Sequence, residues 1–193
     1  MDSKDETREQ IIEAARHIFR RFGFKKTTMD EIALGVNKGK SSMYYYFTSK
    51  DQVFQAVVEK EALMLRAELM TVINADLAPS QKIEEYIKVR MTKFKEMVNF
   101  YDAIKNELLS HLDFIDQIRK KYDEDEICLV NSMLIDGVEK GDFSIENTNL
   151  ASIAIVTAMK GLELPLFWYD GADNIDNRIK NVLQILFYGI KVR

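Results

Sequence analysis

The sequence predicts an all-α protein, with a small N-terminal domain of three helices followed by a larger helical bundle, about nine helices in all. Apolar residues recur at three- and four-residue intervals along most of the chain. Only two prolines and eight glycines interrupt the 193 residues, and these residue types break helices most strongly. With 47% hydrophobic residues, the chain is also apolar enough to bury a core.

Pairs of capping residues divide the N-terminal part into short helices. Three capping boxes, each a Thr or Ser followed three residues later by Glu or Gln, occur at Thr7–Gln10, Thr28–Glu31 and Ser49–Gln52. The apolar spacing predicts a helix over residues 8–22 that ends at Gly23, a helix of about two turns after Thr28, and a third helix over residues 41–47. Two short helices joined by a tight turn make a helix-turn-helix.

Charge is distributed unevenly along the chain. The net charge is −4, but residues 16–50 carry eight basic and two acidic side chains, which leaves −10 for the rest. A negative net charge alone argues against a nucleic-acid partner, whereas a basic segment that carries a helix-turn-helix is typical of one. Chance clustering on a solvated surface would explain the charge if the segment held no motif.

The segments FGFKKTTMDEIA and GKSSMYYYFTSKDQVF resemble the DNA-binding domain of TetR-family regulators. The resemblance extends over about residues 7–60 and implies that the aromatic run belongs to the recognition helix. It also implies a set of DNA contacts: Thr28, Lys40, Ser42, Tyr44, Tyr45, Tyr46 and Lys50. The residue types suit that role, because small hydroxyl side chains let the backbone approach the major groove and lysines attract phosphates. On these grounds Ser41 and Lys38 join the set.

Four successive aromatic residues point around the whole circumference of a helix. Met43 and Phe47 are four residues apart, so we expect both of them in the core. The three tyrosines between them must then lie partly outside, which favours contact with DNA over simple burial.

The turn between the two short helices departs from the family pattern. The family's Ala-Gly-Val-Ser turn falls on residues 36–39, so Lys38 stands where a buried valine is usual. Asn37 and Gly39 are acceptable at their positions, since asparagine tolerates left-handed backbone and glycine can cap a helix. Two alternatives remain for Lys38. Its ammonium reaches toward phosphates while its stem packs inward, or the third helix begins in a shifted register with Gly35 and Val36 forming the turn.

Beyond residue 48 the resemblance is one of layout. We therefore expect a DNA-binding domain over residues 1–48 and an effector-binding and dimerisation domain over residues 49–193. Apolar periodicity predicts helices over about residues 50–75, 80–101, 103–111, 115–140, 148–167 and 175–192. Pro165 is expected to kink or end the fifth of these.

The last two predicted helices are unusually apolar. In TetR-like proteins the corresponding helices pair with their copies as a four-helix bundle, so the resemblance implies a homodimer through these helices. The alternative is that both helices complete the core of a monomer. A helix-turn-helix gains affinity and specificity by reading two half-sites, which favours a dimer on a palindromic operator.

A small-molecule effector site is expected in the body, between the predicted helices over residues 50–75 and 115–140. Large, adaptable apolar side chains and a few polar ones gather there, as is typical of a ligand pocket. The candidate residues are Met64, Met91, Phe94, Met97, Tyr101, His111 and Phe114, with Asn106 as a further polar contact. Core packing is the alternative for each residue taken singly. The expected ligand is apolar or amphipathic and of drug-like size.

Enzymatic and metal chemistry find little support. The chain has two histidines and one cysteine, with no HExxH spacing, Gly-rich phosphate loop or nucleophile elbow, so we expect no catalytic residue, metal or cofactor. We expect Cys128 to be a small buried hydrophobe and the acidic run at residues 123–126 to be a solvated surface. No apolar segment is long enough for a membrane helix or resembles a signal peptide, which predicts a cytoplasmic protein without a membrane partner.

Three classes of function follow from these observations. The first is a repressor that leaves its operator when a small effector binds. The second is a helix-turn-helix regulator controlled by a protein partner. The third is a helical enzyme or structural bundle, which would require the GKSSMYYYF resemblance to be fortuitous.

Overall fold

The computed structural model describes residues 3–97, 113–168 and 175–189, and these ranges form eight helices and no strand. The all-α prediction is therefore confirmed. The chain divides into two compact units, residues 1–64 with 97–119 and residues 65–96 with 120–193. This division falls inside the helix α4 (Lys50–Ile73), whereas the predicted domains divide at residue 48. Which segments act as independent domains stays a prediction.

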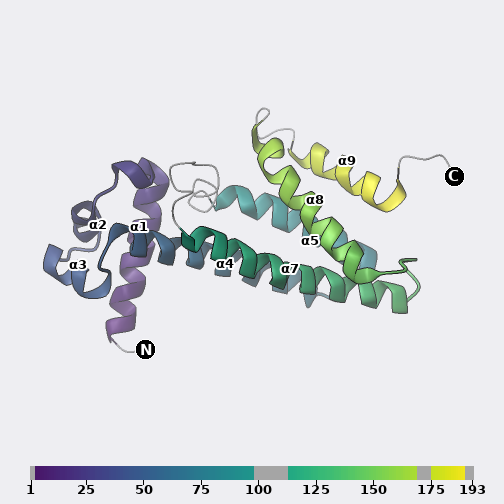
Figure 1. Ribbon diagram of the computed structural model, residues 1–193, viewed down its shortest axis with the longest axis horizontal. Helices are drawn as coiled ribbons and strands as arrows, with labels where there is room; N and C mark the ends of the chain where they lie inside the picture. The colour runs from purple at the N-terminus through teal and green to yellow at the C-terminus, as the bar shows by residue number, and fades with distance from the viewer. Residues whose placement is uncertain (1–2, 98–112, 169–174, 190–193) are drawn as a thin grey trace. The chain divides into compact units, whose positions relative to one another are not determined.

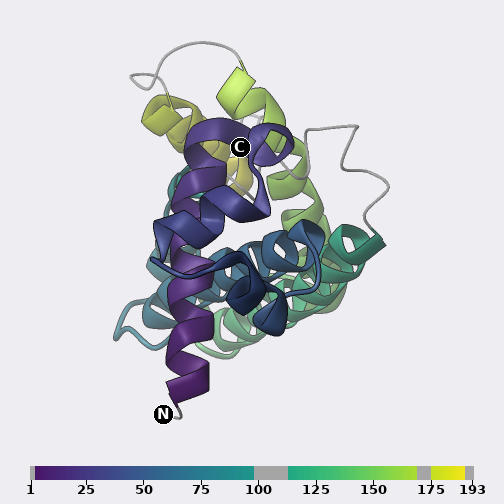
Figure 2. The same cartoon turned by 90° about the vertical axis from the view of Figure 1, so that its left-hand side faces the viewer.

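The first unit begins with three helices, α1 (Ser3–Lys26), α2 (Met29–Gly35) and α3 (Lys40–Tyr46). In it α2 packs on α1, and α3 packs on α2 (Figure 1). Figure 2 shows the same helices from another side, with α1 in purple. Gly23 has a φ of 77° and interrupts α1 where the first helix was predicted to end. The helix begins at Ser3 and not at residue 8, because Asp5 and Glu6 in its first turn interact favourably with the helix dipole.

Aromatic rings fill the interior of this unit. Three rings contact one another: those of Phe19 and Phe24, both in α1, and that of Phe54 in α4. Their centroids lie 4.8 to 5.8 Å apart. Other buried apolar side chains of the unit are Ile11, Ile12, Ala15, Ile32, Met43, Phe47 and Val53. Since α3 contributes Met43 and is followed by Phe47, its apolar side is fixed to this core.

Ion pairs join α1 to α4 within the first unit. Lys60 Nζ lies 2.9 Å from Glu9 Oε2 and 3.2 Å from Glu13 Oε2, and Arg16 Nη2 lies 2.7 Å from Glu13 Oε1. The hydrogen bond from Arg16, assisted by Lys60, lowers the pKa of Glu13 to about 2. Glu13 therefore stays charged near neutral pH, and the acidic row of α1 is directed at α4.

The second unit contains the end of α4 with α5 (Pro79–Glu96), most of α7 (Asp113–Glu139), α8 (Thr148–Trp168) and α9 (Ile175–Tyr188). These bounds agree with the predicted helices to within a few residues, except that α5 ends at Glu96 and not near residue 101. α5 begins with a proline, which suits the first position of a helix because no hydrogen bond from its nitrogen is needed there. α8 runs past Pro165 to Trp168, so Pro165 does not end it. The helix predicted over residues 103–111 lies outside the described residues.

A single apolar cluster forms the core of the second unit, and all five helices contribute to it. Its buried members are Leu69, Val72, Ile83, Tyr86, Ile87, Met91, Val130, Met133, Leu134, Val156, Met159, Ile179 and Leu183. In Figure 1 α8 and α9 lie beside α5, which they both contact. One apolar face fixes α5 in this cluster, since Ile83, Ile87 and Met91 recur every fourth residue along it.

The acidic run on α7 is not a solvated surface, and that expectation was wrong. Asp123 pairs with Lys160 of α8, Asp125 Oδ2 lies 3.5 Å from Arg66 Nη1 of α4, and Glu126 Oε1 lies 2.7 Å from Arg90 Nε of α5. Consecutive helical residues do point in different directions, and in this unit Asp123, Asp125 and Glu126 each meet a cation on a different helix. Glu124, between them, is exposed.

Glu126 and Arg90 form the most buried of these pairs, with side chains 11% and 7% exposed. Arg90 Nη2 also donates to Glu126 Oε2 at 3.2 Å, and the Tyr86 hydroxyl donates to Glu126 Oε1 at 3.3 Å. Burial, reinforced by the Glu126 carboxylate, raises the pKa of Tyr86 far above its ordinary range. The phenol therefore stays protonated as a donor, and the pair joins α5 to α7 inside the core.

A tight turn follows α7 where the sequence reads GVEKGDF. Gly141 has a φ of 78°, and the backbone nitrogens of Asp142 and Phe143 donate to the Gly137 carbonyl at 2.8 and 3.1 Å. The Phe143 ring covers Gly137 so closely that a Cβ there would lie 2.1 Å from Cδ2. The glycine at 137 is thus needed for packing, and the one at 141 for the left-handed backbone that ends the helix.

Cys128 is exposed, so its expected burial was wrong. It lies on α7 two residues after Glu126 and two before the buried Val130, and the opposite faces of a helix are about two residues apart. His17 lies on the surface of α1, with Nε2 3.1 Å from Glu13 Oε1. His111 lies outside the described residues.

Candidate functional site

The α2 helix begins with the predicted capping box. The backbone nitrogen of Glu31 donates to Thr28 Oγ1 at 3.3 Å, and the backbone nitrogen of Thr28 donates to Glu31 Oε2 at 2.7 Å. The Thr28 hydroxyl also donates to Glu31 Oε2 at 2.9 Å. Thr28, a predicted DNA contact, is therefore exposed but already bonded within the unit. Its role toward DNA stays a prediction.

The turn between α2 and α3 occupies residues 36–39, without a shift of register. α2 ends at Gly35, Asn37 takes the left-handed conformation with a φ of 53°, and Gly39 is the N-cap of α3. Asparagine tolerates this conformation better than most residues. Lys38 is exposed. The shifted register is therefore excluded, and a contact of the Lys38 ammonium with phosphates stays a prediction.

The α3 helix has one buried side and one exposed side, as the four-residue spacing of Met43 and Phe47 predicts. These two side chains are 0% and 3% exposed, whereas Tyr44 and Tyr45 are 43% and 67% exposed. Tyr46 is half-buried and packs its ring edge-on against Tyr45 at 5.1 Å between centroids. Ser41 is exposed and Ser42 half-buried. The helix therefore presents hydroxyl groups of serine and tyrosine on an otherwise well-anchored element.

Lys40 begins α3 and is exposed, but it has a partner within the unit. Its Nζ lies 3.0 Å from Asp30 on α2, and this hydrogen bond raises the pKa of Lys40. The pair is fully solvated, so it orients the lysine without holding it firmly. A phosphate would compete with Asp30 for the same ammonium group.

Lys50 has a structural role that the sequence did not indicate. Its Nζ donates to the carbonyl oxygens of Phe24 at 2.8 Å and Thr27 at 3.0 Å, and it lies 4.3 Å from the centroid of the Phe24 ring. It thereby ties the start of α4 to the segment that follows the break in α1. An ammonium group has three N–H donors, so one remains for the predicted contact with DNA.

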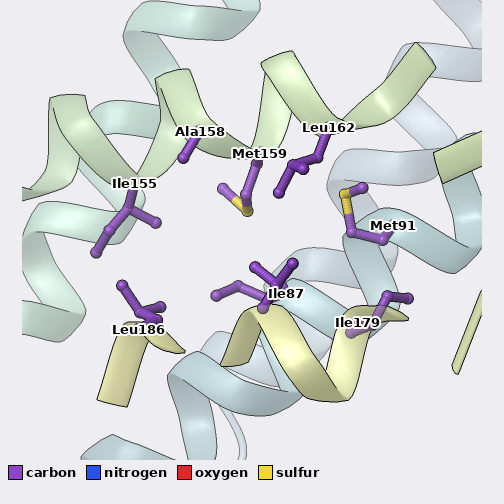
Figure 3. A pocket seen from close by; sticks show the side chains of 9 residues that line it. Ile87, Met91, Ile155, Ala158, Met159, Leu162, Ile179 and Leu186 are labelled. Carbon is purple, nitrogen blue, oxygen red and sulfur yellow. The ribbon is translucent and has the colours of Figure 1, made fainter. Parts of the chain in front are cut away.

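A second candidate site is a small apolar cavity inside the second unit, between α5, α8 and α9. Figure 3 shows side chains from these three helices pointing into it. The cavity has a volume of about 40 Å³ and is lined by Ile87, Met91, Ile155, Ala158, Met159, Leu162, Ile179, Val182 and Leu186. Every lining side chain is apolar, so the cavity can take a hydrocarbon group but offers it no side-chain hydrogen bond.

Among the predicted effector residues whose side chains the structure describes, which are Met64, Met91 and Met97, only Met91 lines this cavity. Met64 is exposed on α4 and Met97 is buried in the first unit. Phe94 and Phe114 belong to α5 and α7, but their side chains lie outside the description, as do Tyr101 and His111 altogether. A site made by the predicted set stays a prediction.

Sequence reasoning missed the α8 and α9 residues of the cavity. The signal was present, because Ile155, Met159 and Leu162 recur at the helical spacing on α8. It was interpreted as a dimer interface, with the core of a monomer as the alternative, and not as a ligand site. A helix that is apolar on several sides can line a cavity with one side and form an interface with another. Periodicity does not distinguish these two roles.

Comparison with known proteins shows what the N-terminal part of the chain is similar to. Residues 11–57 match the family of bacterial regulatory proteins described as the tetR family. Over its N-terminal part the chain is therefore similar to regulators of the TetR family. RutR of Escherichia coli K12, a helix-turn-helix transcriptional regulator, is 31% identical over 84 residues, 44% of this chain. IcaR of Staphylococcus aureus, a negative regulator of a biofilm operon, is 38% identical over 52 residues, 27% of this chain. The match spans 39% of RutR and 28% of IcaR.

Solved structures resemble this chain in fold over nearly its whole length. A transcriptional regulator from Cytophaga hutchinsonii superposes with a TM-score of 0.81 at 24% identity, covering 95% of this chain and 98% of that one. FadR from Bacillus subtilis, solved with stearoyl-CoA, superposes with a TM-score of 0.72 at 19% identity, covering 95% and 99%. At these identities the likeness concerns the fold alone.

Two further properties concern only the part of the chain that the structure describes. None of its helices is both long and apolar enough to cross a membrane. Nor does it contain a group of three or more His, Cys, Asp or Glu side chains placed to hold a metal ion.

Proposed function

We propose that this chain is a DNA-binding transcriptional regulator of the TetR family that reads its operator with α3. The observation that carries the proposal is the division of α3 into a buried side, Met43 with Phe47, and an exposed side of serine and tyrosine hydroxyls next to Lys38 and Lys40. Hydroxyl groups and ammonium groups donate to phosphate oxygens, and small side chains allow close approach to the major groove. The predicted contact set, from Thr28 to Lys50, belongs to this proposal.

The proposed operator-binding form is a homodimer through α8 and α9. These helices expose large apolar side chains, including Leu150, Ile153, Ile185, Leu186 and Tyr188, the last of them 72% exposed. Large apolar side chains exposed in this number on two packed helices support an interface, because large exposed apolar surface is uncommon on a monomer. A two-fold dimer would present two copies of α3 to a palindromic site in the cytoplasm, where the operator DNA resides.

We predict that the protein binds a palindrome in its own upstream DNA as a dimer, with recognition helices about one helical turn apart, roughly 34–36 Å. Sedimentation at micromolar concentration and a footprint of the bound fragment measure both properties. Replacing Ile185 and Tyr188 by serine should shift the protein to monomers and weaken operator binding. Replacing the exposed Leu63 on α4 by serine is the control. A monomeric wild-type protein, or a footprint without two-fold symmetry, would contradict the dimer.

We further propose that the protein represses transcription from its operator. A small apolar or amphipathic molecule would control its binding to DNA. The α5–α8–α9 cavity supplies an apolar site, and FadR of Bacillus subtilis, whose fold is similar, was solved with stearoyl-CoA. A volume of about 40 Å³ is far below the roughly 300–1,000 Å³ of drug-sized pockets. A long-chain ligand must therefore open the space between these helices. A ligand that binds only an opened state favours that state, which is the requirement for a switch.

For such a ligand we predict mutual antagonism with the operator. A coupling of about 1–3 kcal/mol lowers DNA affinity about 5- to 150-fold, and saturating operator must weaken ligand binding by the same factor. The probes are stearoyl-CoA and a free long-chain fatty acid, titrated by calorimetry with and without operator. Ile155→Trp, which fills the cavity from a half-buried position, should reduce ligand binding and leave operator affinity intact. Equal ligand affinities in the two titrations would remove the regulatory role.

The small volume of the cavity also favours an alternative, a regulator whose body binds a protein partner. In that case none of the probes binds to the wild-type chain or changes its melting temperature. The DNA-binding proposal is unaffected by that outcome, because it depends on α3 alone.

A further inference from the structure

The first three turns of α1 separate their charges by helix face. Lys4 and Arg8 are four residues apart and so lie on one face, while Glu9 and Glu13 lie on the neighbouring face. The acidic face is satisfied within the unit by Lys60 of α4. Lys4 and Arg8 are both exposed, and neither makes an ion pair with a carboxylate among the described residues.

The basic face of α1 lies against the recognition helix. Lys4 Nζ is 4.9 Å from the centroid of the Tyr45 ring, and the Arg8 guanidinium carbon is 5.0 Å from the centroid of the Phe47 ring. Cations at this distance from an aromatic face are attracted to it, which limits the range of positions that a long side chain occupies. Phe47 is buried in the core of the unit, so its ring supports Arg8 from a packed position.

We propose that Lys4 and Arg8 are DNA-phosphate contacts that extend the α3 surface, and that Tyr45 and Phe47 hold them in position for it. The inference rests on the proposed DNA-binding function and adds two residues that lie outside the helix-turn-helix. Tyr45 is one of the predicted contacts, so a cation held on its ring is held beside the proposed interface. DNA phosphates recur every few ångströms along the groove that a recognition helix enters, and two cations next to that helix meet a surface of opposite charge.

The test is the salt dependence of operator binding, measured between about 50 and 200 mM salt. The slope is that of log affinity against log salt concentration, and each lost phosphate contact lowers its magnitude by about 0.9. The double variant K4Q/R8Q should lower the slope by about 1.8 for each subunit of the dimer that engages DNA. K120Q/K121Q removes two exposed lysines from α7 and makes the same change in net charge, so it should leave the slope as in the wild type. Circular dichroism checks that each variant keeps its helicity.

A second measurement tests the positioning by Tyr45. Phenylalanine keeps the ring and loses the hydroxyl, whereas leucine loses both. K4Q should therefore lower the slope in the Y45F background as it does in the wild type, and have a smaller effect in the Y45L background.

The outcomes separate this inference from the function on which it rests. If the wild-type protein and K4Q/R8Q bind the operator with the same salt-dependence slope, the inference is wrong and the DNA-binding function still stands. A wild-type protein that binds no upstream DNA overturns the proposed function and the inference with it. A slope that falls equally in K120Q/K121Q also overturns the inference, because it shows an effect of net charge and not of position.

Discussion

Replacing Glu126 by alanine is expected to lower the free energy of unfolding by about 3–5 kcal/mol, because it leaves the Arg90 charge in the core without its carboxylate. Arg90 Nε and Nη2 both donate to Glu126, at 2.7 and 3.2 Å, and the Tyr86 hydroxyl bonds to the same carboxylate. Removing one partner of a buried pair costs more than the pair itself contributes, since the remaining charge keeps its desolvation penalty. Thermal or denaturant unfolding measures the effect.

Glu124→Ala is the matched control for this change. It is the same substitution two residues away on α7, at an exposed position, and should change stability by no more than about 0.5 kcal/mol. The double variant R90M/E126L removes both charges and should recover much of the loss, since an apolar pair of similar volume is often neutral in such positions. A loss below about 1 kcal/mol in Glu126→Ala, a typical value for an ordinary point substitution, would contradict the importance of the pair.

Replacing Lys40 and Tyr44 together by alanine is expected to weaken operator binding roughly 100-fold, as two lost hydrogen bonds to charged phosphates of about tenfold each would do. Tyr44 is 43% exposed and Lys40 is held only by the solvated pair with Asp30. Neither side chain contributes to the buried core of the first unit, so the helices and the melting temperature should be nearly unchanged. A mobility-shift titration gives the affinity, and circular dichroism gives the helicity.

F22A/K25A provides the control for this pair. It also removes one exposed aromatic and one lysine from the first unit, but from the end of α1 and not from α3, and it should bind the operator like the wild type. Unchanged affinity of K40A/Y44A with native helicity would remove these residues from the interface. Equal losses in the two double variants would indicate a general effect of charge and aromatic content.

The helix-turn-helix could be predicted from the sequence because its signals are local. Thr28 and Glu31 cap each other across three residues, Gly23 interrupts α1, and Met43 and Phe47 share a face because they are four apart. Interactions over three or four residues depend little on the rest of the fold. The turn at Asn37 was left with two alternatives, and the backbone resolves them because only one register gives α3 its cap at Gly39.

The sites of the body could be predicted only in part. The apolar faces of α5, α8 and α9 were visible in the sequence, but the position of the cavity depends on how three helices meet. Met64, Met91 and Met97 were all predicted for the effector site, yet one is exposed, one lines the cavity and one is buried in the other unit. Periodicity gives the apolar face of a helix and not its neighbour.

By itself the sequence determined the helices, their caps, the orientation of α3 on its own core and the separation of a basic head from an acidic body. Only the tertiary structure decided the partners of charged side chains. It gave Lys50 the carbonyl oxygens of Phe24 and Thr27, and it distributed the acidic run of α7 among cations on three other helices. The physical reason is the range of the forces involved. Hydrogen bonds and steric contacts within one helix are set by neighbours three or four residues away, whereas an ion pair between helices depends on a geometry that exists only after the helices have packed.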